Sequence, residues 1–595
     1  MSLTSSLLIG RSALNASQAA IQVTGNNMAN AATPGYHRQR AELGPVRGQR
    51  VGLGFAGAGV EITRITRAID PALTARFRGA IAHENAAAVE RTVLNSVESL
   101  MNELTGDDLS SQMSRFFNAW SELANNPGSS VTRAAVVEEG ANLAGFVNGL
   151  RSDLLAQRRQ IEQQISFNVD RANTLLNQIA GLNMAVVNAE QGNATEGNLR
   201  DQRDMLLNEL AGMLDVTVIE RESGAVDVLV DSFPVILGTT ARGMELDVRS
   251  VPANPQTGQP GGVEYRIMSV RNQEEIRLTS GTLGGLLQQR EGTIQRTINE
   301  LDALAATLAF EVNRLHTSGR PANGITDITA AQRLDASEWS MALNDPANST
   351  MALLPFGPSN GSFQVTVTDE NGNSYQQTIF IDLDGVDNGG ATGFGDDTSL
   401  DDIRAAINAV PNLNAEITAT GALRIYTDSG YEVSFSDDTS GVLALLGINT
   451  FFTGSNAGDL AVAGRIRSDS ESLSVGTGPG QNDTALAIAS LRNTPISSLP
   501  RTANGELGVS GGQVTLQDLW GRTVERNAVQ AMSAETRFNS LSTVRQSLEA
   551  QDRAISGVSM DEETINLIQY QQQYQGAARF ISVVDELTKL LLSLV

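Results

Sequence analysis

Paired carboxylates are the residues in this sequence that come closest to a catalytic pattern. Asp396-Asp397 and Asp437-Asp438 are chain neighbours in turn-rich segments. A glycosidase uses two carboxyl groups whose surroundings give them different pKa values. Adjacent acids in loops have no obvious burial or neighbouring charge that would separate their pKa values. A secreted, carboxylate-dependent hydrolase is therefore kept only as a remote alternative.

An acidic stretch from Asp382 to Gly389 has the composition of a calcium-binding loop. The EF-hand loop requires an oxygen ligand at its fifth position and glycine at its sixth. Val386 and Asp387 occupy those two positions, so the register of the motif fails. We predict an acidic β-turn here rather than a calcium site.

Residues 52–57 read Gly-Leu-Gly-Phe-Ala-Gly and match the GxGxxG pattern of dinucleotide-binding proteins. That function needs a helix directly after the glycines, because the helix N-terminus holds the pyrophosphate. Val60, Ile62 and Arg64 instead alternate as the residues of a strand do. The pattern predicts a flexible glycine turn that enters a strand.

Three scarce residue types exclude whole classes of site. The sequence has no Cys, which excludes thiol catalysis, disulfides and iron–sulfur clusters. Its single Lys, Lys589, precedes Leu590, so there is no Walker-A motif. The three His residues, His37, His83 and His316, are far apart and form no HExxH pattern. We predict no catalytic residues, no cofactor and no metal.

The charge of the chain is unevenly distributed. The net charge is −25, which argues against nucleic acid as a partner because phosphate binding requires clustered cations. Residues 1–60 hold five Arg and one acid, whereas residues 331–500 hold 21 acids and six Arg. The acidic segment is expected to be a solvated outer surface, and the basic end can pack against partners.

No part of the sequence predicts membrane insertion. The longest apolar runs fall well short of the roughly 20 residues that a spanning helix needs. The first residues lack the charged region and continuous apolar core of a cleaved secretory signal. If the protein is exported, we expect a route without a cleaved signal peptide.

Both ends of the chain carry a heptad signal. At the N-terminus the apolar positions are Leu3, Leu7, Leu14, Ile21 and Met28. At the C-terminus an unbroken alternation of spacings of three and four gives Leu567, Tyr570, Tyr574, Ala577, Ile581, Val584, Thr588, Leu591 and Val595. Such positions form the seam of a coiled coil. We predict that these two stripes are the assembly interface.

Neither terminal helix is expected to be stable alone. Isolated helices are marginal in water, and Gly10 and Gly576 each cost about 1 kcal/mol relative to Ala. The two ends should therefore pair with each other or become ordered on assembly. A helical hairpin inside one monomeric core stays open as the alternative.

The interior of the sequence alternates between helical and strand patterns. Apolar spacing predicts long helices near 93–104, 141–190, 284–316 and 515–555. Alternating residues around Ser223-Gly224 and around Asn371-Gly372 predict two β-hairpins. The stretch 398–452 predicts a short helix followed by strands.

These patterns predict an α+β, multidomain fold. Helices from both halves of the chain should form a long antiparallel bundle with a β-rich outer domain inserted in it and coiled-coil terminal helices. The predicted units are 1–70 and 559–595 for a domain that holds the two terminal helices, 71–320 and 506–558 for the bundle, and 321–505 for the acidic outer domain.

A polar motif follows the first helix: Asn26, Asn27, Met28, Ala29 and Asn30, then Thr33, Pro34, Gly35 and Tyr36. Asn30 can leave the helix in the left-handed conformation, and Thr33 before Pro34 is forced to be extended. These residues by themselves require no more than a helix stop and a turn.

This motif resembles the shared signature of the flagellar axial family of rod, hook and hook-associated proteins. The stretch 57–78 and the C-terminal Asp561, Glu562 and Glu563 with Gln571–Gln575 are similar to its hook-associated members. The segment 481–491 resembles the return of that family from its inserted domain. The matching segments cover about a quarter of the chain, in the family's order.

The resemblance implies a structural subunit that joins hook to filament and is not an enzyme. It also implies self-assembly in a ring, contacts with hook protein and a second junction hook-associated protein, and an export chaperone on the C-terminal helix. The implied location is extracellular, in the flagellum, after export without a cleaved signal peptide. Another axial protein, such as hook protein or a flagellin-like subunit, remains the alternative.

Overall fold

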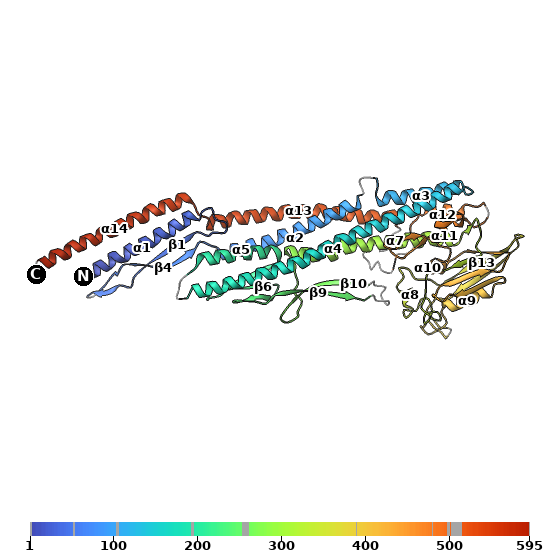
Figure 1. The fold of residues 1–595 in the computed structure, drawn as a ribbon, viewed down its shortest axis with the longest axis horizontal. Coiled ribbons are helices and arrows are strands. Elements are labelled where there is room, and N and C mark those ends of the chain that lie inside the picture. Colours follow the sequence, from blue (N-terminus) through green and yellow to red (C-terminus); the bar gives the residue numbers. More distant parts are fainter. Residues whose placement is uncertain are drawn as a thin grey trace.

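The structure is a computed structural model of the 595-residue chain, and it forms a long rod (Figure 1). It describes residues 3–51, 54–102, 106–191, 195–252, 261–387, 389–478, 480–496, 500 and 514–593. Both chain ends lie at one end of the rod, and a β-rich domain lies at the other. The fold is α+β, as the sequence predicts. Val595 and the predicted domain boundary at 505/506 lie outside the described residues.

The terminal part of the rod joins the first and last helices. Helix α1 (Leu3–Ala29) packs along α14 (Met560–Ser593), and the two run in opposite directions. A β-ribbon packs on α1; its strands are β1 (Gln39–Pro45), β2 (Gln49–Val51), β3 (Gly54–Ala56) and β4 (Val60–Arg67). The predicted strand after the glycine turn is thus β4, while Gly52 and Leu53 fall outside the described part.

Long helices form the middle of the rod. They are α2 (Pro71–Met101), α3 (Leu109–Asn125), α4 (Ser130–Ala189), α5 (Gly197–Met213), α6 (Gly281–Gln289), α7 (Gln295–Thr317), α12 (Asp483–Ser490) and α13 (Leu516–Ser556). Several of these helices begin at a side-chain cap. Asp70 caps α2 ahead of Pro71, and Thr515 forms a capping box with Asp518. The helix predicted at 284–316 is interrupted by a π-helical turn, η1 (Arg290–Ile294).

Strands pack along the side of these helices. A four-stranded antiparallel sheet contains β5 (Val216–Glu220), β6 (Val226–Val230), β7 (Phe233–Leu237) and β8 (Thr240–Ala241). A separate hairpin follows, β9 (Met244–Val251) with β10 (Gly262–Ser269). The predicted hairpin at Ser223-Gly224 is confirmed as β5–β6, and Gly224 takes the positive φ of 83° that its turn requires.

The outer domain has a core of its own. Its buried apolar residues run from Ile325 to Ile448, whereas Phe451 to Leu491 join the core of the long helices. Its elements are β12 (Asp327–Thr329), α8 (Ser349–Ala352), β13 (Gly361–Asp369), β14 (Ser374–Ile381), α9 (Leu400–Asn408), β15 (Leu413–Ile417), β16 (Leu423–Thr427), β17 (Tyr431–Ser436) and α10 (Val442–Leu446). The predicted hairpin at Asn371-Gly372 is confirmed as β13–β14.

Short elements connect this domain to the helices. They are β11 (Arg320–Pro321), β18 (Phe452–Thr453), β19 (Ala461–Val462), α11 (Gly464–Ser468), η2 (Ser470–Ser472) and β20 (Ser474–Gly476). Fully buried His316 lies at this connection, with its Nδ1 2.7 Å from the Asn449 carbonyl oxygen. Its Nε2 accepts a hydrogen bond from the Ser474 backbone N–H at 3.0 Å. Burial lowers the pKa of His316 to about 3, so its ring is neutral at pH 7.

Candidate assembly interface at the joined chain ends

The predicted C-terminal stripe lies mostly on the side of α14 that contacts α1. Ala577 and Val584 are buried, and Leu567, Tyr570 and Ile581 are half-buried. Tyr574 and Leu591 are more exposed, at 37% and 51%. From Ala577 to Thr588 a buried or half-buried residue therefore recurs every three or four positions along α14.

The predicted N-terminal stripe does not form the buried side of α1. Leu3, Leu14, Ile21 and Met28 are half-buried, and Leu7 is 37% exposed. Small residues spaced by three and four contact the neighbouring elements instead: Gly10, Ala13, Ser17, Ala20, Thr24 and Asn27. The sequence did contain a pattern for this buried side of α1, but the pattern consists of small residues rather than large apolar ones.

The two helices approach closely because of these small residues. A Cβ atom added at Gly10 would lie 2.6 Å from Cγ1 of Ile581. Beside this contact is an open groove of about 520 Å³. Its walls come from α1, α14 and the ribbon: Ile9, Gly10, Ala13, Ala16, Ser17, Leu43, Val60, Gln573, Gly576, Ala577 and Phe580.

A second apolar stripe on α14 is exposed, and its first residue, Phe580, also lines the groove beside α1. Phe580, Val583, Leu587 and Leu590 are 44%, 54%, 49% and 60% exposed. They are spaced by three, four and three residues, so they share one side of the helix. We call these four residues the outward stripe. Such a continuous exposed apolar side is typical of a protein-binding surface.

A buried polar cluster connects the motif after α1 to the first turn of α14. Asn27 donates from Nδ2 to Glu563 Oε2 at 3.0 Å, and Arg38 donates from Nε to Glu563 Oε1 at 2.7 Å. Tyr36 donates from its hydroxyl to Asn27 Oδ1 at 2.8 Å. Glu563 is 1% exposed and Arg38 is 9% exposed. The motif residues from both chain ends thus meet at one point.

The remaining motif residues shape the loop. Asn26 donates to the Tyr36 hydroxyl at 3.1 Å, and Asn30 donates to the Asn26 carbonyl oxygen at 2.9 Å. The prediction that Asn30 is left-handed is wrong; Gly35, with φ of 74°, makes the turn. Of the acidic motif, Glu562 bonds Arg38 at 2.6 Å while its side chain stays 62% exposed. Thr33 and Pro34 are exposed in the loop, as is Asp561 at the start of α14.

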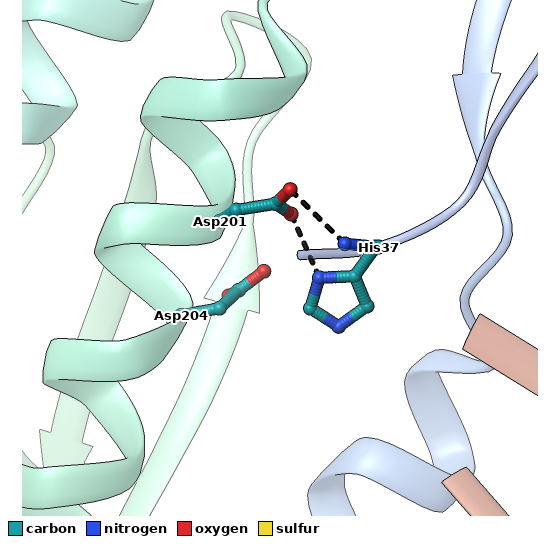
Figure 2. A group of neighbouring side chains, drawn as sticks. All are labelled: His37, Asp201 and Asp204. Carbon is teal, nitrogen blue, oxygen red and sulfur yellow. Dashed lines mark hydrogen bonds and ion pairs between the residues drawn. The ribbon is translucent and has the colours of Figure 1, made fainter. Parts of the chain in front are cut away.

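A second polar cluster fixes the ribbon to helix α5. The His37 Nδ1 lies 2.7 Å from Oδ1 of Asp201, and the His37 backbone N–H donates to Oδ2 of the same carboxylate at 3.2 Å (Figure 2). Arg67 contacts both Asp201 and Asp204 at 2.7 Å. Arg78 contacts Asp204 at 3.0 Å.

Electrostatics in this cluster favour charged, paired side chains. Burial would raise the pKa of Asp204, but the Arg67 and Arg78 guanidinium groups outweigh it and lower that pKa. Burial, with the nearby Asp201 and Glu563 carboxylates, raises the pKa of Tyr36 to about 12. His37, Asp201 and Asp204 have the geometry of a metal site, but Arg67 already bonds both carboxylates. The cluster is a structural junction between the chain ends and the long helices.

Sequence reasoning did not identify most residues of this junction. Arg67 and Arg78 lie 134 and 126 residues from their Asp partners, Asp201 and Asp204 respectively. No local spacing connects groups so far apart. Arg38 is different, because it lies two residues after the motif and could have been proposed as a partner for the acidic turn.

The other candidate residues lie elsewhere. His83 is exposed on α2, and His316 is buried at the outer-domain connection. Asp382, Asp384 and Asp397 bring carboxylate oxygens within 4.8 Å of one another. Within the described residues, no helix is long and apolar enough to cross a membrane.

Comparison with protein-family models gives three matches. The model described as the helical domain of flagellar hook-associated protein FlgK matches residues 94–329. The C-terminal model of the flagellar basal body rod FlgEFG proteins matches residues 554–594. The flagella basal body rod protein model matches residues 7–37.

Curated relatives match over nearly the whole chain. Flagellar hook-associated protein 1 of Salmonella typhimurium is 26% identical over 589 residues, 98% of each chain. The protein of the same name from Escherichia coli is 24% identical over 597 residues, again 98% of each. That of Bacillus subtilis is 28% identical over 346 residues, 53% of this chain and 67% of the relative.

A solved structure of the flagellar hook junction protein FlgK from Burkholderia pseudomallei aligns over 81% of this chain and all of that chain. Its TM-score of 0.46 and 15% identity are too low to bear on the fold. The full-length relatives and the family models at both ends and in the middle agree with one another. This chain is therefore similar over nearly its whole length to flagellar hook-associated protein 1 of these bacteria.

Proposed function

We propose that this chain is a structural subunit of the hook–filament junction that assembles through its joined terminal helices. Its work is mechanical: it connects one tubular lattice to another and turns over no substrate. The outward stripe of α14 carries the assembly part of the proposal. Four large apolar residues exposed by 44% to 60% on one helix side have no ready explanation in an isolated subunit.

The energetic argument concerns what covers that stripe. Fully burying a Leu, Val or Phe side chain contributes roughly 1.5–3 kcal/mol. Four such residues on each subunit, with the exposed Leu7 and Leu8 of α1, supply a strong drive for association. In the proposed assembly a neighbouring subunit's terminal helices cover the outward stripe.

The predicted interface residues divide between two roles in this proposal. Leu567, Tyr570, Tyr574, Ile581 and Val584 hold α14 against α1 within a subunit. The large N-terminal residues and Leu591 meet neighbouring subunits: Leu3, Leu7, Leu14, Ile21, Met28 and Leu591. The result would be a coiled-coil inner tube.

We further propose the partners that this similarity suggests. The subunits form a ring between hook protein and a second junction hook-associated protein. An export chaperone covers the C-terminal helix before assembly, and the subunit reaches the outside of the cell without a cleaved signal peptide. The acidic outer domain, within 321–505, faces solvent. The other two units are the helical bundle, 71–320 with 506–558, and the unit of the terminal helices, 1–70 with 559–595.

Electron microscopy of a strain that lacks the gene tests this function. We expect hooks without filaments, and restoration of filaments when the gene is supplied again. Normal filaments on the deletion strain would contradict the proposal. Loss of the hook itself would instead favour the alternative assignment as hook protein.

A further inference from the structure

Strand β14 is the exposed edge of a small sheet at the far end of the rod. The sheet has the order β14–β13–β17, so within the described part of the chain β14 has one strand neighbour. Its eight residues pair with β13 without a register shift. An edge strand presents unpaired backbone groups that can bind another strand.

The unpaired backbone groups belong to alternate residues of β14. The Asp369 N–H donates to the Asn373 carbonyl oxygen at 2.9 Å, so the backbone of Asn373 faces β13. Because this direction alternates along an antiparallel strand, Ser374, Gln376, Thr378 and Phe380 direct their N–H and C=O groups to the free edge. The next residue that faces this edge is Asp382. Its N–H donates to the Thr398 hydroxyl at 2.8 Å, and its carbonyl oxygen accepts from the Thr398 N–H at 2.7 Å.

This edge lacks the usual protection against pairing. Proteins block exposed edges with charged residues, proline or bulges. The β14 sequence Ser-Tyr-Gln-Gln-Thr-Ile-Phe-Ile has no charge, no Pro and no Gly. It also exposes two aromatic side chains, Phe380 at 79% and Tyr375 at 48%. An uncharged segment with this β-propensity is well suited to strand pairing.

Carboxylates flank the edge at both ends. Asp369 and Glu370 precede β14, and exposed Asp382 and Asp384 follow it, with Asp397 beside them. Among the described residues none of these five carboxylates has an ion pair. Each end of the strand therefore has an uncompensated negative potential, while its centre is neutral.

This charge pattern discriminates against a second copy of the chain. Antiparallel pairing of two β14 strands would place the Asp369–Glu370 end of one against the Asp382–Asp384 end of the other. Parallel pairing would place each acidic end against its own copy. Like charges placed directly opposite destabilise strand pairing, so both arrangements are disfavoured.

We propose that the free edge of β14 is a docking site for an extended peptide strand of another protein, neutral in its centre and basic at both ends. Backbone hydrogen bonds to the even-numbered residues provide the binding, and the two acidic ends select the charge. An eight-residue strand spans about 27 Å, which sets the separation of the two basic groups.

Fluorescence anisotropy with the full chain tests this proposal. The probe is a fluorescein-labelled peptide, Arg-Thr-Val-Thr-Val-Thr-Val-Thr-Arg, and the control peptide carries Glu at both ends. We expect saturable binding of the Arg peptide that weakens as salt rises, and binding at least tenfold weaker for the Glu peptide. No binding, or equal binding of the two peptides, would overturn the proposal.

Two substitutions at one position test the edge itself. Thr378→Pro removes an outward N–H and leaves the hydrogen bonds to β13, so this strand should still form. We expect it to weaken peptide binding at least tenfold, whereas Thr378→Val should stay within twofold of the unmodified chain. Equal binding by Thr378→Pro, with an unchanged melting temperature, would contradict the site.

Two further measurements keep the outcome decisive. If Thr378→Pro does not fold, the double variant Asp382→Asn with Asp384→Asn should bind the Arg peptide at least threefold more weakly and the Glu peptide more tightly. No change in either would count against the proposal. Analytical ultracentrifugation compares self-association of the unmodified chain and Thr378→Pro; self-association lost in the variant would make the occupant a second copy and overturn the proposed partner.

Discussion

Glu563 and Arg38 lie 525 residues apart in sequence and bond each other in a buried position. A buried pair of this kind contributes less to net stability than its attraction suggests, because both charges lose water. Removing one partner is different, since it leaves an unpaired buried charge. The single carboxylate of Glu563 therefore controls how firmly α14 is held to the loop after α1.

Glu563→Gln should release the first turns of α14. One amide oxygen cannot replace two carboxylate oxygens, so Arg38 or Asn27 loses its acceptor. Because Arg38 keeps its bond to Glu562, we expect a local loss of roughly 1–3 kcal/mol, measured as faster amide exchange at residues 560–570. The matched control is Glu562→Gln, whose side chain is 62% exposed and should cost under about 1 kcal/mol. Equal effects of the two substitutions would contradict this account.

His316 should make stability depend on pH. Its folded pKa of about 3 lies below the value of 6.5 for an unperturbed histidine. Between those values the unfolded chain binds a proton that the folded chain does not, so stability falls as pH falls from 6.5 toward 3.

His316→Gln should remove that contribution, worth up to about 1.4 kcal/mol per pH unit. The measurement is chemical unfolding of both proteins between pH 6 and pH 4. The unmodified chain should show the steeper loss of stability on acidification. Identical slopes would show that His316 titrates normally in the folded chain.

At the scale of elements, α1 contributes small residues rather than its large ones to the contact with α14. Heptad spacing correctly predicted that both ends are helical, but the large residues it singled out on α1 are not the ones buried within the subunit. The reason is physical. An apolar pattern is recognised from large side chains, whereas Gly10 has no side chain and acts by letting the two helices approach closely. Only the position of α14, which is a tertiary feature, distinguishes the two sides.

Gly10→Ala should weaken this helix pair. The added Cβ would lie 2.6 Å from Ile581 Cγ1, and such overpacking costs roughly 1–3 kcal/mol. Gly25→Ala is the control in the same helix, because its Cβ meets nothing within 4 Å; it should gain up to about 1 kcal/mol from helix propensity. Amide exchange at 567–588 should accelerate in the first variant only. Unchanged exchange in Gly10→Ala would show that the helices tolerate separation.

Features formed by residues close together in the sequence could be predicted, and contacts between residues far apart could not. Local patterns predicted the β13–β14 hairpin from Asn371-Gly372 and the helix α13 from its apolar spacing. The salt bridges of Arg67 and Arg78 with α5 join segments far apart in the chain. Such contacts depend on how helices from both halves are arranged, which no short window of sequence contains.

At the scale of the whole molecule, the terminal helices are separate from the main cores. Neither large apolar core includes a residue of α1 or α14. A chain that lacks residues 559–595 should therefore keep the long helices and the outer domain folded. We expect its main thermal transition within a few degrees of that of the full chain, measured by circular dichroism. A large drop would show that α14 supports the rest of the fold.

The outward stripe provides the most direct test of assembly. The quadruple variant Phe580→Ser, Val583→Ser, Leu587→Ser and Leu590→Ser is expressed in a strain without the original gene, and hooks are counted by electron microscopy. The control is Val131→Ser, a residue 76% exposed on α4. We predict bare hooks for the quadruple variant and normal filaments for the control. Normal filaments on the quadruple variant would contradict assembly through the terminal helices.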